Sequence, residues 1–233
     1  MMMGNKLVFV LLGPPGSGKG TQAERISQAF KLEHIDTGQA LREEIRLQSE
    51  IGQIAKSYVD KGQLVPSDVV QGVIESAMLR IKPEQQGYLL DGFPRNYEQA
   101  KGLDLILAHL GQSLNSVFYM DIPMPLLFDR LAYRQSCSQC STKYNTKLNP
   151  PIKPDTCDRC GTSSLVSRKD DAPEVIQSRL DSYQAETSPL VQLYTERGLL
   201  ERIDASQSID LVVKTLSDSI HSHEKIFAGA TQA

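Results

Sequence analysis

The stretch Gly13-Pro14-Pro15-Gly16-Ser17-Gly18-Lys19-Gly20-Thr21 decides the fold, because it joins an apolar run to a helical pattern. The run before it, Leu7-Val8-Phe9-Val10-Leu11-Leu12, has no polar break, which is typical of a strand buried on both faces. In the segment 21–30 that follows, apolar residues recur at helical spacing. A strand, a glycine loop and a helix in this order predict a phosphate-binding loop.

The chemistry of the loop agrees with this prediction. Backbone N–H groups around Gly16, Ser17 and Gly18 can point at an anion, and the following helix adds partial positive charge at its N-terminus. Lys19 supplies a point charge that can reach the outer phosphates. Gly20 stands where most such loops carry a Ser or Thr that ligates Mg²⁺, so this contact is absent or partly supplied by Thr21. A glycine turn with a surface lysine is the alternative, but it does not explain the flanking strand and helix.

Strand and helix patterns alternate along most of the chain. Beyond the first strand and helix, we expect strands at about 34–36, 88–91, 116–122 and 199–203, and helices at about 38–47, 51–61, 67–80, 97–110, 125–135, 173–186, 189–197 and 208–221. Thr37 is the expected N-cap of the helix at 38–47, and the tail 224–233 is expected to fray. Because parallel strands need crossovers of this length, the pattern predicts an α/β fold with a doubly wound, five-stranded parallel sheet. Residues 36–65 form a small helical excursion from it.

The segment 136–170 interrupts the alternation and carries all four cysteines. Cys137-x-x-Cys140 and Cys157-x-x-Cys160 are separated by sixteen residues, a spacing close to that of four-thiolate zinc sites. A pair of disulfides is the alternative. Because we expect no secretion signal, metal binding by the cysteines is favoured over disulfides. A closed site of four cysteines has no open coordination position, so we expect structural Zn²⁺ that substitutes for a hydrophobic core.

Asp91 ends a strand that should lie beside the phosphate loop. Its carboxylate can hold Mg²⁺, directly or through water. It can also cap a helix, and the two roles are compatible. Arg95 follows in the same loop, and ligands bind at the carboxyl ends of such strands. Further arginines are candidates for phosphate contacts, although each taken singly can equally be a solvated surface charge: Arg42, Arg130, Arg134, Arg168 and Arg179.

Composition limits the partners and the compartment. The chain has 233 residues, 40% of them hydrophobic, and a net charge of −3, which argues against a general nucleic-acid surface. No apolar run approaches the ~20 residues of a membrane span. The first strand begins close to Met1, so we expect no signal peptide and a cytoplasmic protein.

Four motifs together resemble the adenylate kinases in order and spacing: Gly13 to Thr21, Asp36-Thr37-Gly38, Asp91-Gly92-Phe93-Pro94-Arg95 and Arg168-Lys169-Asp170-Asp171. The four-cysteine insert resembles the lid of the zinc-containing, long-lid bacterial form. The resemblance implies a P-loop core domain of residues 1–35, 66–132 and 172–233, an AMP-binding domain at 36–65 and a lid at 133–171. It also implies a monomer that catalyses the reversible, Mg²⁺-dependent reaction of ATP and AMP to two ADP.

The resemblance also implies roles for single residues. For ATP binding they are Gly16, Ser17, Gly18, Lys19, Gly20, Thr21, Arg134, Tyr144 and Gln207. For AMP binding they are Thr37, Arg42, Leu64, Val65, Gly92, Arg95, Gln99, Arg168 and Arg179. For catalysis they are Lys19, Arg95, Arg130, Arg134, Arg168 and Arg179, with Asp91 on Mg²⁺ through water. Four positions depart from the family pattern: Gln39 replaces an Asp, Gln135 an Arg, Asn145 a His and Ala205 a Gly.

Two rival functions remain at this point. A nucleoside monophosphate kinase that acts on UMP or CMP would share the phosphate loop, although Thr37, Gln99 and the long insert favour AMP. A zinc-ribbon protein that binds nucleic acid and has a regulatory nucleotide site is the other rival. The negative net charge and the lack of a basic, aromatic ribbon face argue against it.

Overall fold

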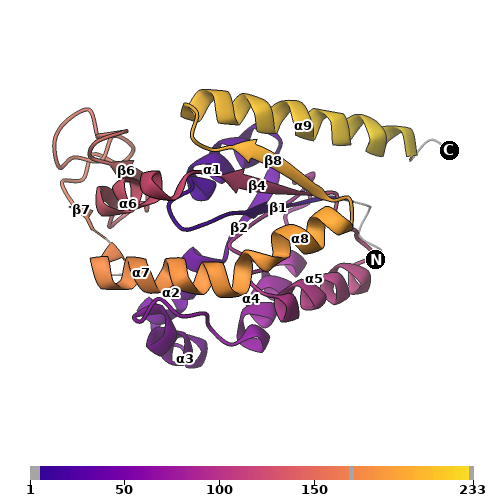
Figure 1. The fold of residues 1–233 in the computed structure, drawn as a ribbon, viewed down its shortest axis with the longest axis horizontal. Coiled ribbons are helices and arrows are strands. Elements are labelled where there is room, and N and C mark those ends of the chain that lie inside the picture. Colours follow the sequence, from indigo (N-terminus) through magenta and orange to yellow (C-terminus); the bar gives the residue numbers. More distant parts are fainter. Residues whose placement is uncertain (1–5, 168–170, 231–233) are drawn as a thin grey trace.

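The computed structural model describes residues 6–167 and 171–230, and its core is a five-stranded parallel sheet (Figure 1). The strands are β1 (Leu7–Leu12), β2 (Leu32–Asp36), β3 (Gly87–Asp91), β4 (Ser116–Asp121) and β8 (Leu200–Asp204), in the order β2-β3-β1-β4-β8. The predicted fold class is confirmed. The order runs outward in both directions from β1, so the loop after β1 lies at the switch point where such sheets bind ligands.

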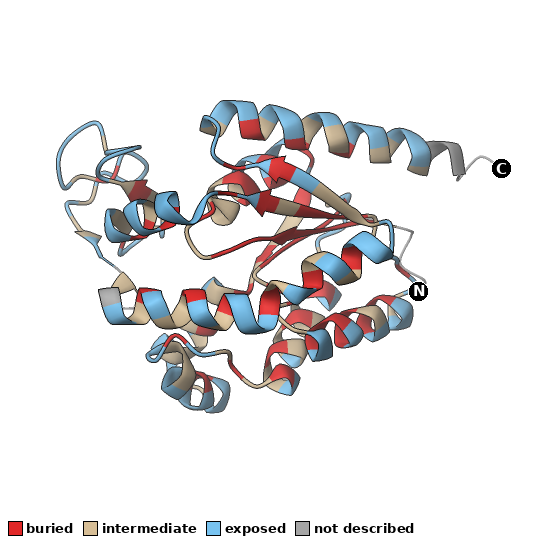
Figure 2. Cartoon of the chain, in the orientation of Figure 1, coloured by how far each residue is buried: buried red, intermediate tan, exposed pale blue. Residues whose placement is uncertain are grey.

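Helices cover both faces of the sheet because β1 is apolar on both sides. Phe9 packs with α1 (Lys19–Ala29) and α9 (Ile209–Ala230) on one face. Val10 packs with α4 (Ser67–Leu79), α5 (Tyr97–His109) and α8 (Pro189–Glu196) on the other. β1 and β3 are buried along their whole length and β4 along most of it, whereas the edge strands β2 and β8 are only partly buried. Each covering helix buries only an inner stripe (Figure 2). The sheet therefore supplies a rigid base for the loops at its carboxyl edge.

The helical excursion from the sheet consists of α2 (Thr37–Leu47) and α3 (Glu50–Val59). The predicted N-cap at Thr37 is wrong. Asp36 caps α2, because it ends β2 in an extended conformation and its Oδ1 accepts a hydrogen bond of 2.8 Å from the Gln39 N–H. Asp at this position is as good a cap as Thr or better. The start of α2 therefore does not depend on the side chain of Gln39.

We call residues 133–171 the cysteine insert. It follows α6 (Met124–Ala132) and contains β5 (Arg134–Cys137), β6 (Lys143–Asn145) and β7 (Leu165–Val166), which form an antiparallel sheet in the order β6-β5-β7. The predicted helix at 125–135 is therefore too long. Arg134 pairs with Asn145 across the small sheet, and this pairing with a distant segment ends the helix.

A bent rod of helices runs along the sheet (Figure 1). It consists of α7 (Pro173–Ser182), a π-helical turn at Tyr183–Thr187 and α8. The last helix, α9, runs through Ala230, so the predicted end near His221 is wrong. The tail predicted to fray is helical as far as residue 230, and residues 231–233 lie outside the described residues. Phe227 packs against the core cluster around Phe9, and His223 Nε2 lies 2.8 Å from Glu201 Oε1. These long-range contacts hold the helix beyond the point where its sequence pattern weakens.

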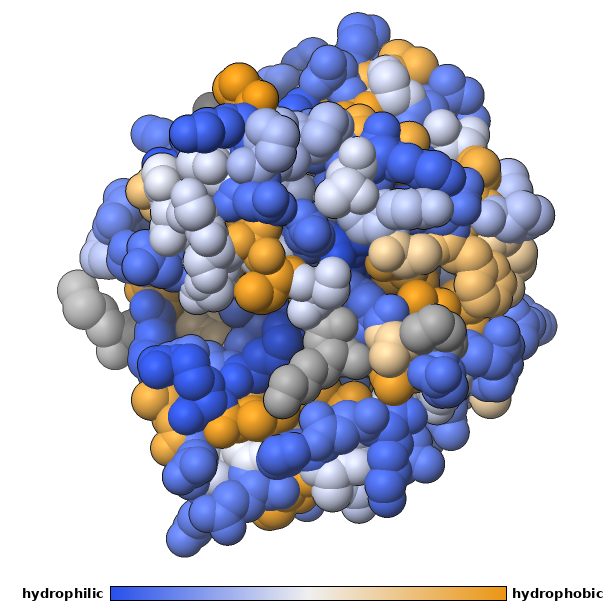
Figure 3. Space-filling model, turned by 90° about the vertical axis from the view of Figure 1, so that its left-hand side faces the viewer, coloured by the Kyte–Doolittle hydropathy of each residue, from blue (hydrophilic) through white to orange (hydrophobic). Residues whose placement is uncertain are grey.

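Hydrophilic side chains cover most of the face that carries the cysteine insert, and apolar side chains form small separate groups on it (Figure 3). Within the described ranges, none of the helices combines the length and the apolar character that a membrane span requires.

Candidate active site

A cavity of about 690 Å³ opens at the carboxyl edge of the sheet. Its walls come from the phosphate loop, the ends of β2 and β3, α7, the cysteine insert and the loop 205–209. A smaller cavity of about 80 Å³ adjoins it beneath α2 and shares with it Arg42, Leu64, Gly92, Arg95 and Arg179. Segments that lie far apart in the sequence therefore form one cleft with two lobes.

The phosphate loop has the conformation that the glycine spacing predicts. Gly16 and Gly18 adopt φ values of 85° and 95°, which favour glycine. A Cβ atom on Gly16 would also lie 2.9 Å from Leu131 Cγ of α6, so this position has no room for a side chain. The turn leads directly into the N-terminus of α1, and Lys19, Gly20 and Thr21 of its first turn line the larger cavity. A helix N-terminus favours anions through its partial positive charge.

Lys19 folds back over this loop instead of extending into solvent. Its Nζ donates to the carbonyl oxygens of Gly13 at 2.7 Å and Pro14 at 2.9 Å. Burial lowers the pKa of Lys19 to about 8; the carboxylate of Asp91 opposes this shift, and the guanidinium groups of Arg95, Arg179 and Arg134 add to it. The ammonium is therefore held in a positive surrounding that suits a polyanion.

Asp91 ends β3 beside the loop, and its side chain is 9% exposed. His34 Nε2 lies 3.6 Å from its Oδ2. The alternative prediction that Asp91 caps a helix is wrong, since Asn96 caps α5 by accepting the Gln99 N–H at 2.9 Å. A buried carboxylate beside a phosphate site is chemically suited to a hydrated Mg²⁺.

The arginines converge on the cleft. Arg134 Nε donates to Asp171 Oδ2 at 2.7 Å and Arg179 Nη1 to Asp171 Oδ1 at 2.9 Å, so one carboxylate that is 3% exposed orients two guanidinium groups. Arg130 Nη1 donates to the Ser17 carbonyl at 3.4 Å. Arg42 and Arg95 line both lobes. The surface-charge alternative is therefore wrong for Arg42, Arg130, Arg134 and Arg179, whereas Arg168 lies outside the described residues.

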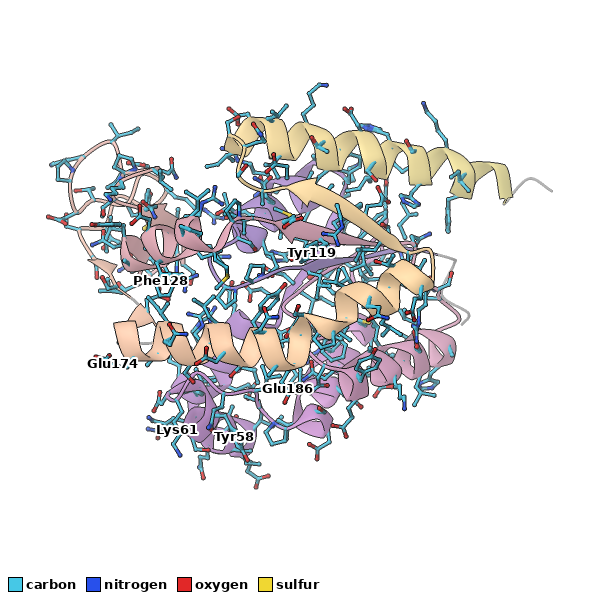
Figure 4. The ribbon with its side chains drawn as sticks, viewed as in Figure 1. Tyr58, Lys61, Tyr119, Phe128, Glu174 and Glu186 are labelled. Carbon is cyan, nitrogen blue, oxygen red and sulfur yellow. The ribbon has the colours of Figure 1, made fainter. Side chains whose placement is uncertain are left out.

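Arg95 is fixed through its backbone. Its N–H donates to Gln99 Oε1 at 2.8 Å, and its carbonyl accepts a hydrogen bond of 2.7 Å from Thr187 Oγ1 of the π-helical turn. Nearby, Tyr119 projects from β4 toward that turn, and its hydroxyl lies 3.4 Å from that of Tyr183 (Figure 4). The segment of α7, the π-helical turn and α8 thus holds the loop that carries Arg95 in place.

The remaining predicted residues also line the two lobes. Those on the larger lobe are Gly16, Ser17, Gly18, Gly20, Thr21, Tyr144 and Gln207, together with the departures Asn145 and Ala205. Those on the smaller lobe are Thr37, Leu64, Val65, Gly92 and Gln99. Tyr144 additionally belongs to the cysteine insert, where its hydroxyl accepts the Asp158 N–H at 2.8 Å. Sequence reasoning assigned no role to Asp171, Thr187 or Lys143, although Asp171 stands in a quoted motif.

The four cysteines form a second, separate site. Their sulfur atoms lie within 4.8 Å of one another, with 3.5 Å between Cys137 and Cys160 and between Cys140 and Cys157. A disulfide needs about 2.05 Å, whereas four sulfurs at ~2.3 Å from one tetrahedral zinc are separated by ~3.8 Å. All four thiols are free. The donor set fits Zn²⁺, and the disulfide alternative is wrong.

Comparison with known proteins gives one family. The family model described as adenylate kinase matches residues 11–199. The adenylate kinase of Caldanaerobacter subterraneus subsp. tengcongensis is 42% identical over 213 residues, which cover 91% of this chain and 95% of the relative. The adenylate kinase of Moorella thermoacetica is 42% identical over 213 residues, which cover 91% of this chain and 97% of the relative. The adenylate kinase of Methanothrix thermoacetophila is 44% identical over 210 residues, which cover 90% of this chain and 96% of the relative.

Proposed function

The chain belongs to the adenylate kinase family. On this premise we propose which lobe of its cleft binds ATP and which binds AMP. The protein is a nucleoside monophosphate kinase that catalyses ATP + AMP = 2 ADP. ATP binds with its phosphates on the loop 16–21, and AMP occupies the smaller lobe beneath α2. One observation carries this assignment: the two lobes meet at shared arginines, so two phosphate groups can face each other there.

Each residue set serves one nucleotide in this proposal. Lys19 and Arg134 bind the ATP phosphates, and Tyr144 and Gln207 border its base. Arg42 and Arg95 bind the AMP phosphate. The AMP base lies between the backbone of Leu64 and Val65 and the side chain of Gln99, with Thr37 and Gly92 at the edge. Arg130 and Arg179 flank the transferred group, and we extend this role to Arg168.

Phosphoryl transfer asks the protein for in-line alignment and for neutralisation of spread negative charge. Lys19 and the arginines supply that charge from fixed positions, which lowers the cost of reorganisation during the reaction. Mg²⁺, held by Asp91 through water, would neutralise the ATP phosphates when bound. We propose that the cysteine insert is the lid, which excludes water from the reacting phosphate and is stabilised by structural zinc.

The family assignment extends to the domains, the oligomeric state and the compartment of the protein. Residues 1–35, 66–132 and 172–233 form the core domain, 36–65 the AMP-binding domain and 133–171 the lid. We propose a monomer, as the family resemblance implies. Free thiols arranged for zinc are compatible with a reducing compartment, so we propose the cytoplasm. The net charge of −3 supports small nucleotides over nucleic acid as partners.

A coupled assay tests the proposed function. ADP formation from ATP is measured with AMP, UMP or CMP as acceptor, and without any acceptor. We expect rapid ADP formation with AMP alone among the three monophosphates. Faster turnover with UMP or CMP would overturn the AMP assignment, and turnover without an acceptor would identify an ATPase. Retention of DNA or RNA on a filter would instead favour the nucleic-acid binder.

Loss of one arginine should distinguish the AMP lobe from the ATP lobe. Arg42→Ala should raise the KM for AMP by about 10-fold to 100-fold, because a charge-assisted hydrogen bond to phosphate is lost, and should leave the KM for ATP nearly unchanged. Arg46→Ala is the matched control, since Arg46 lies one turn along α2, pairs with Glu43 and is 69% exposed. Initial-rate kinetics with each nucleotide varied decide the outcome, and a larger change for ATP than for AMP would contradict the site assignment.

The rate with ATP should depend on the ionisation of Lys19. The pKa of Lys19 is about 8 without nucleotide, so the fraction of charged ammonium falls as the pH rises above that value. We expect kcat/KM for ATP to decline by up to about tenfold per pH unit above pH 8. Bound polyphosphate favours the charged form and raises this pKa, so kcat should stay level over the range where kcat/KM declines. A kcat/KM profile that stays flat to pH 9.5 would contradict the assignment.

A further inference from the structure

Lys143 reaches from the cysteine insert across the cleft. It lies on β6, and its Nζ is 3.4 Å from Oδ2 of Asp36, which ends β2 of the core sheet. The two side chains are 25% and 15% exposed, and both line the larger cavity. This ion pair therefore connects the insert to the core inside the cleft, where solvent screens it less than at the surface.

The Lys143 ammonium also packs against the phosphate loop. A Cβ atom on Gly20 would lie 2.3 Å from Lys143 Nζ and 3.3 Å from Asp91 Oδ2. A side chain at position 20 would thus displace the ammonium. The ammonium lies at the N-terminus of α1, where free N–H groups already carry partial positive charge. A further positive charge is stable there only beside anions, such as the carboxylates of Asp36 and Asp91 or the phosphates of a nucleotide.

Asp36 is well suited to hold this ammonium. Its Oδ1 caps α2 by accepting the Gln39 N–H at 2.8 Å, which leaves Oδ2 facing Lys143. Burial by itself raises the pKa of Asp36, but Lys143 and then Arg42 outweigh it and hold the pKa below its ordinary value. The carboxylate is therefore charged and fixed in orientation.

We propose that Lys143 is a positioning residue for the phosphoryl donor, brought by the insert to the phosphate loop and held there by Asp36. The inference rests on the proposed function, because it assigns the added charge to the ATP phosphates. The ammonium reaches Gly20 only when the insert lies over the loop. Binding of a polyanion and closure of the insert therefore favour each other, as two linked equilibria must.

Lys147 provides a matched control within the same insert. Its Nζ lies 4.3 Å from the centroid of the Tyr133 ring and 3.8 Å from Asp129, and its side chain is 53% exposed. It has the same charge as Lys143 and lies four residues away, but it does not line the cleft. If only the charge or the stability of the insert mattered, substitution of Lys143 and substitution of Lys147 should therefore change ATP binding equally.

The experiment compares Lys143→Met, Lys143→Arg and Lys147→Met in the zinc-loaded full chain. We expect Lys143→Met to lower kcat/KM for ATP and the calorimetric affinity for ATP by about 10-fold to 100-fold, with little change in the KM for AMP. Lys143→Arg should recover part of this loss, and Lys147→Met should match the wild type. Zinc content and melting temperature show whether each variant is folded.

Asp36→Asn tests whether Asp36 holds the lysine. Asn remains a good helix cap, so the change removes the charge and keeps the start of α2. On its own it should lower kcat/KM for ATP, but by less than Lys143→Met does. In the Lys143→Met background it should have no further effect, because it then has no ammonium to hold, and a double-mutant cycle measures this coupling.

Three outcomes would overturn the inference. They are equal ATP affinities of Lys143→Met and Lys147→Met, a parallel loss for ATP and AMP that tracks lost zinc, and an undiminished effect of Asp36→Asn without Lys143. The proposed function is decided separately, by ADP formation in the wild type alone. Since ATP affinity is measured by calorimetry, the role of Lys143 is tested even if another phosphate acceptor proves correct.

Discussion

Replacing Lys19 with alanine should lower kcat by about 10²–10³-fold, the loss commonly seen when one preorganised electrostatic donor is removed. Its ammonium is held in the loop by the carbonyls of Gly13 and Pro14 and faces the same cavity as the arginines. It should interact most strongly with the charge that develops on the transferring phosphoryl group. The affinity for ATP should therefore fall much less than the rate.

Single-turnover and steady-state kinetics of Lys19→Ala measure this effect. Lys19→Met, which preserves most of the side-chain volume, distinguishes loss of charge from collapse of the loop. Lys101→Ala is a control at an exposed position of α5, away from the cleft. Near-normal turnover in a folded Lys19→Met protein would remove Lys19 from the catalytic set, and a loss confined to ATP affinity would reduce it to a ground-state contact.

Cys157→Ser should release zinc and lower the melting temperature, with unfolding that begins in the cysteine insert. Binding free energy at such sites is largely folding free energy, about 10–16 kcal/mol in zinc-finger peptides. The buried cluster of this insert is built around Cys137, Tyr144 and Cys157, so two of its three buried members are themselves proposed zinc ligands. Without the metal, little apolar burial remains to hold the three short strands together.

Metal analysis and hydrogen exchange measure the two halves of this prediction. We expect one zinc per chain in the wild type and in Ser163→Ala, an exposed position of the same insert, and close to none in Cys157→Ser. Exchange should accelerate first at residues 136–167. Activity should survive at low temperature, because no cysteine takes part in the chemistry. Zinc near zero in reduced wild-type protein, or unchanged exchange after chelation, would contradict the structural role of the metal.

The interior of each element could be predicted, because its signal is local. The run Leu7–Leu12 marks β1, and the glycines of the phosphate loop require a backbone that other residues adopt at a cost. The element ends were less predictable. α6 ends at Ala132 because Arg134 pairs with a strand further along the chain, and α9 continues because Phe227 finds a core to pack against.

The sequence by itself determined the doubly wound sheet, the phosphate loop and the four-cysteine cluster. The loop and the cluster each depend on a short stretch of chain, and the sheet depends on strand and helix patterns that are each local. Only the tertiary structure decided how the charged groups pair. Asp171 holds Arg134 and Arg179 together, and Lys143 meets Asp36 across 107 positions of sequence. Residue type fixes the charge of a side chain, but the partner that fixes its position is set by how distant segments are brought to the same edge of the sheet.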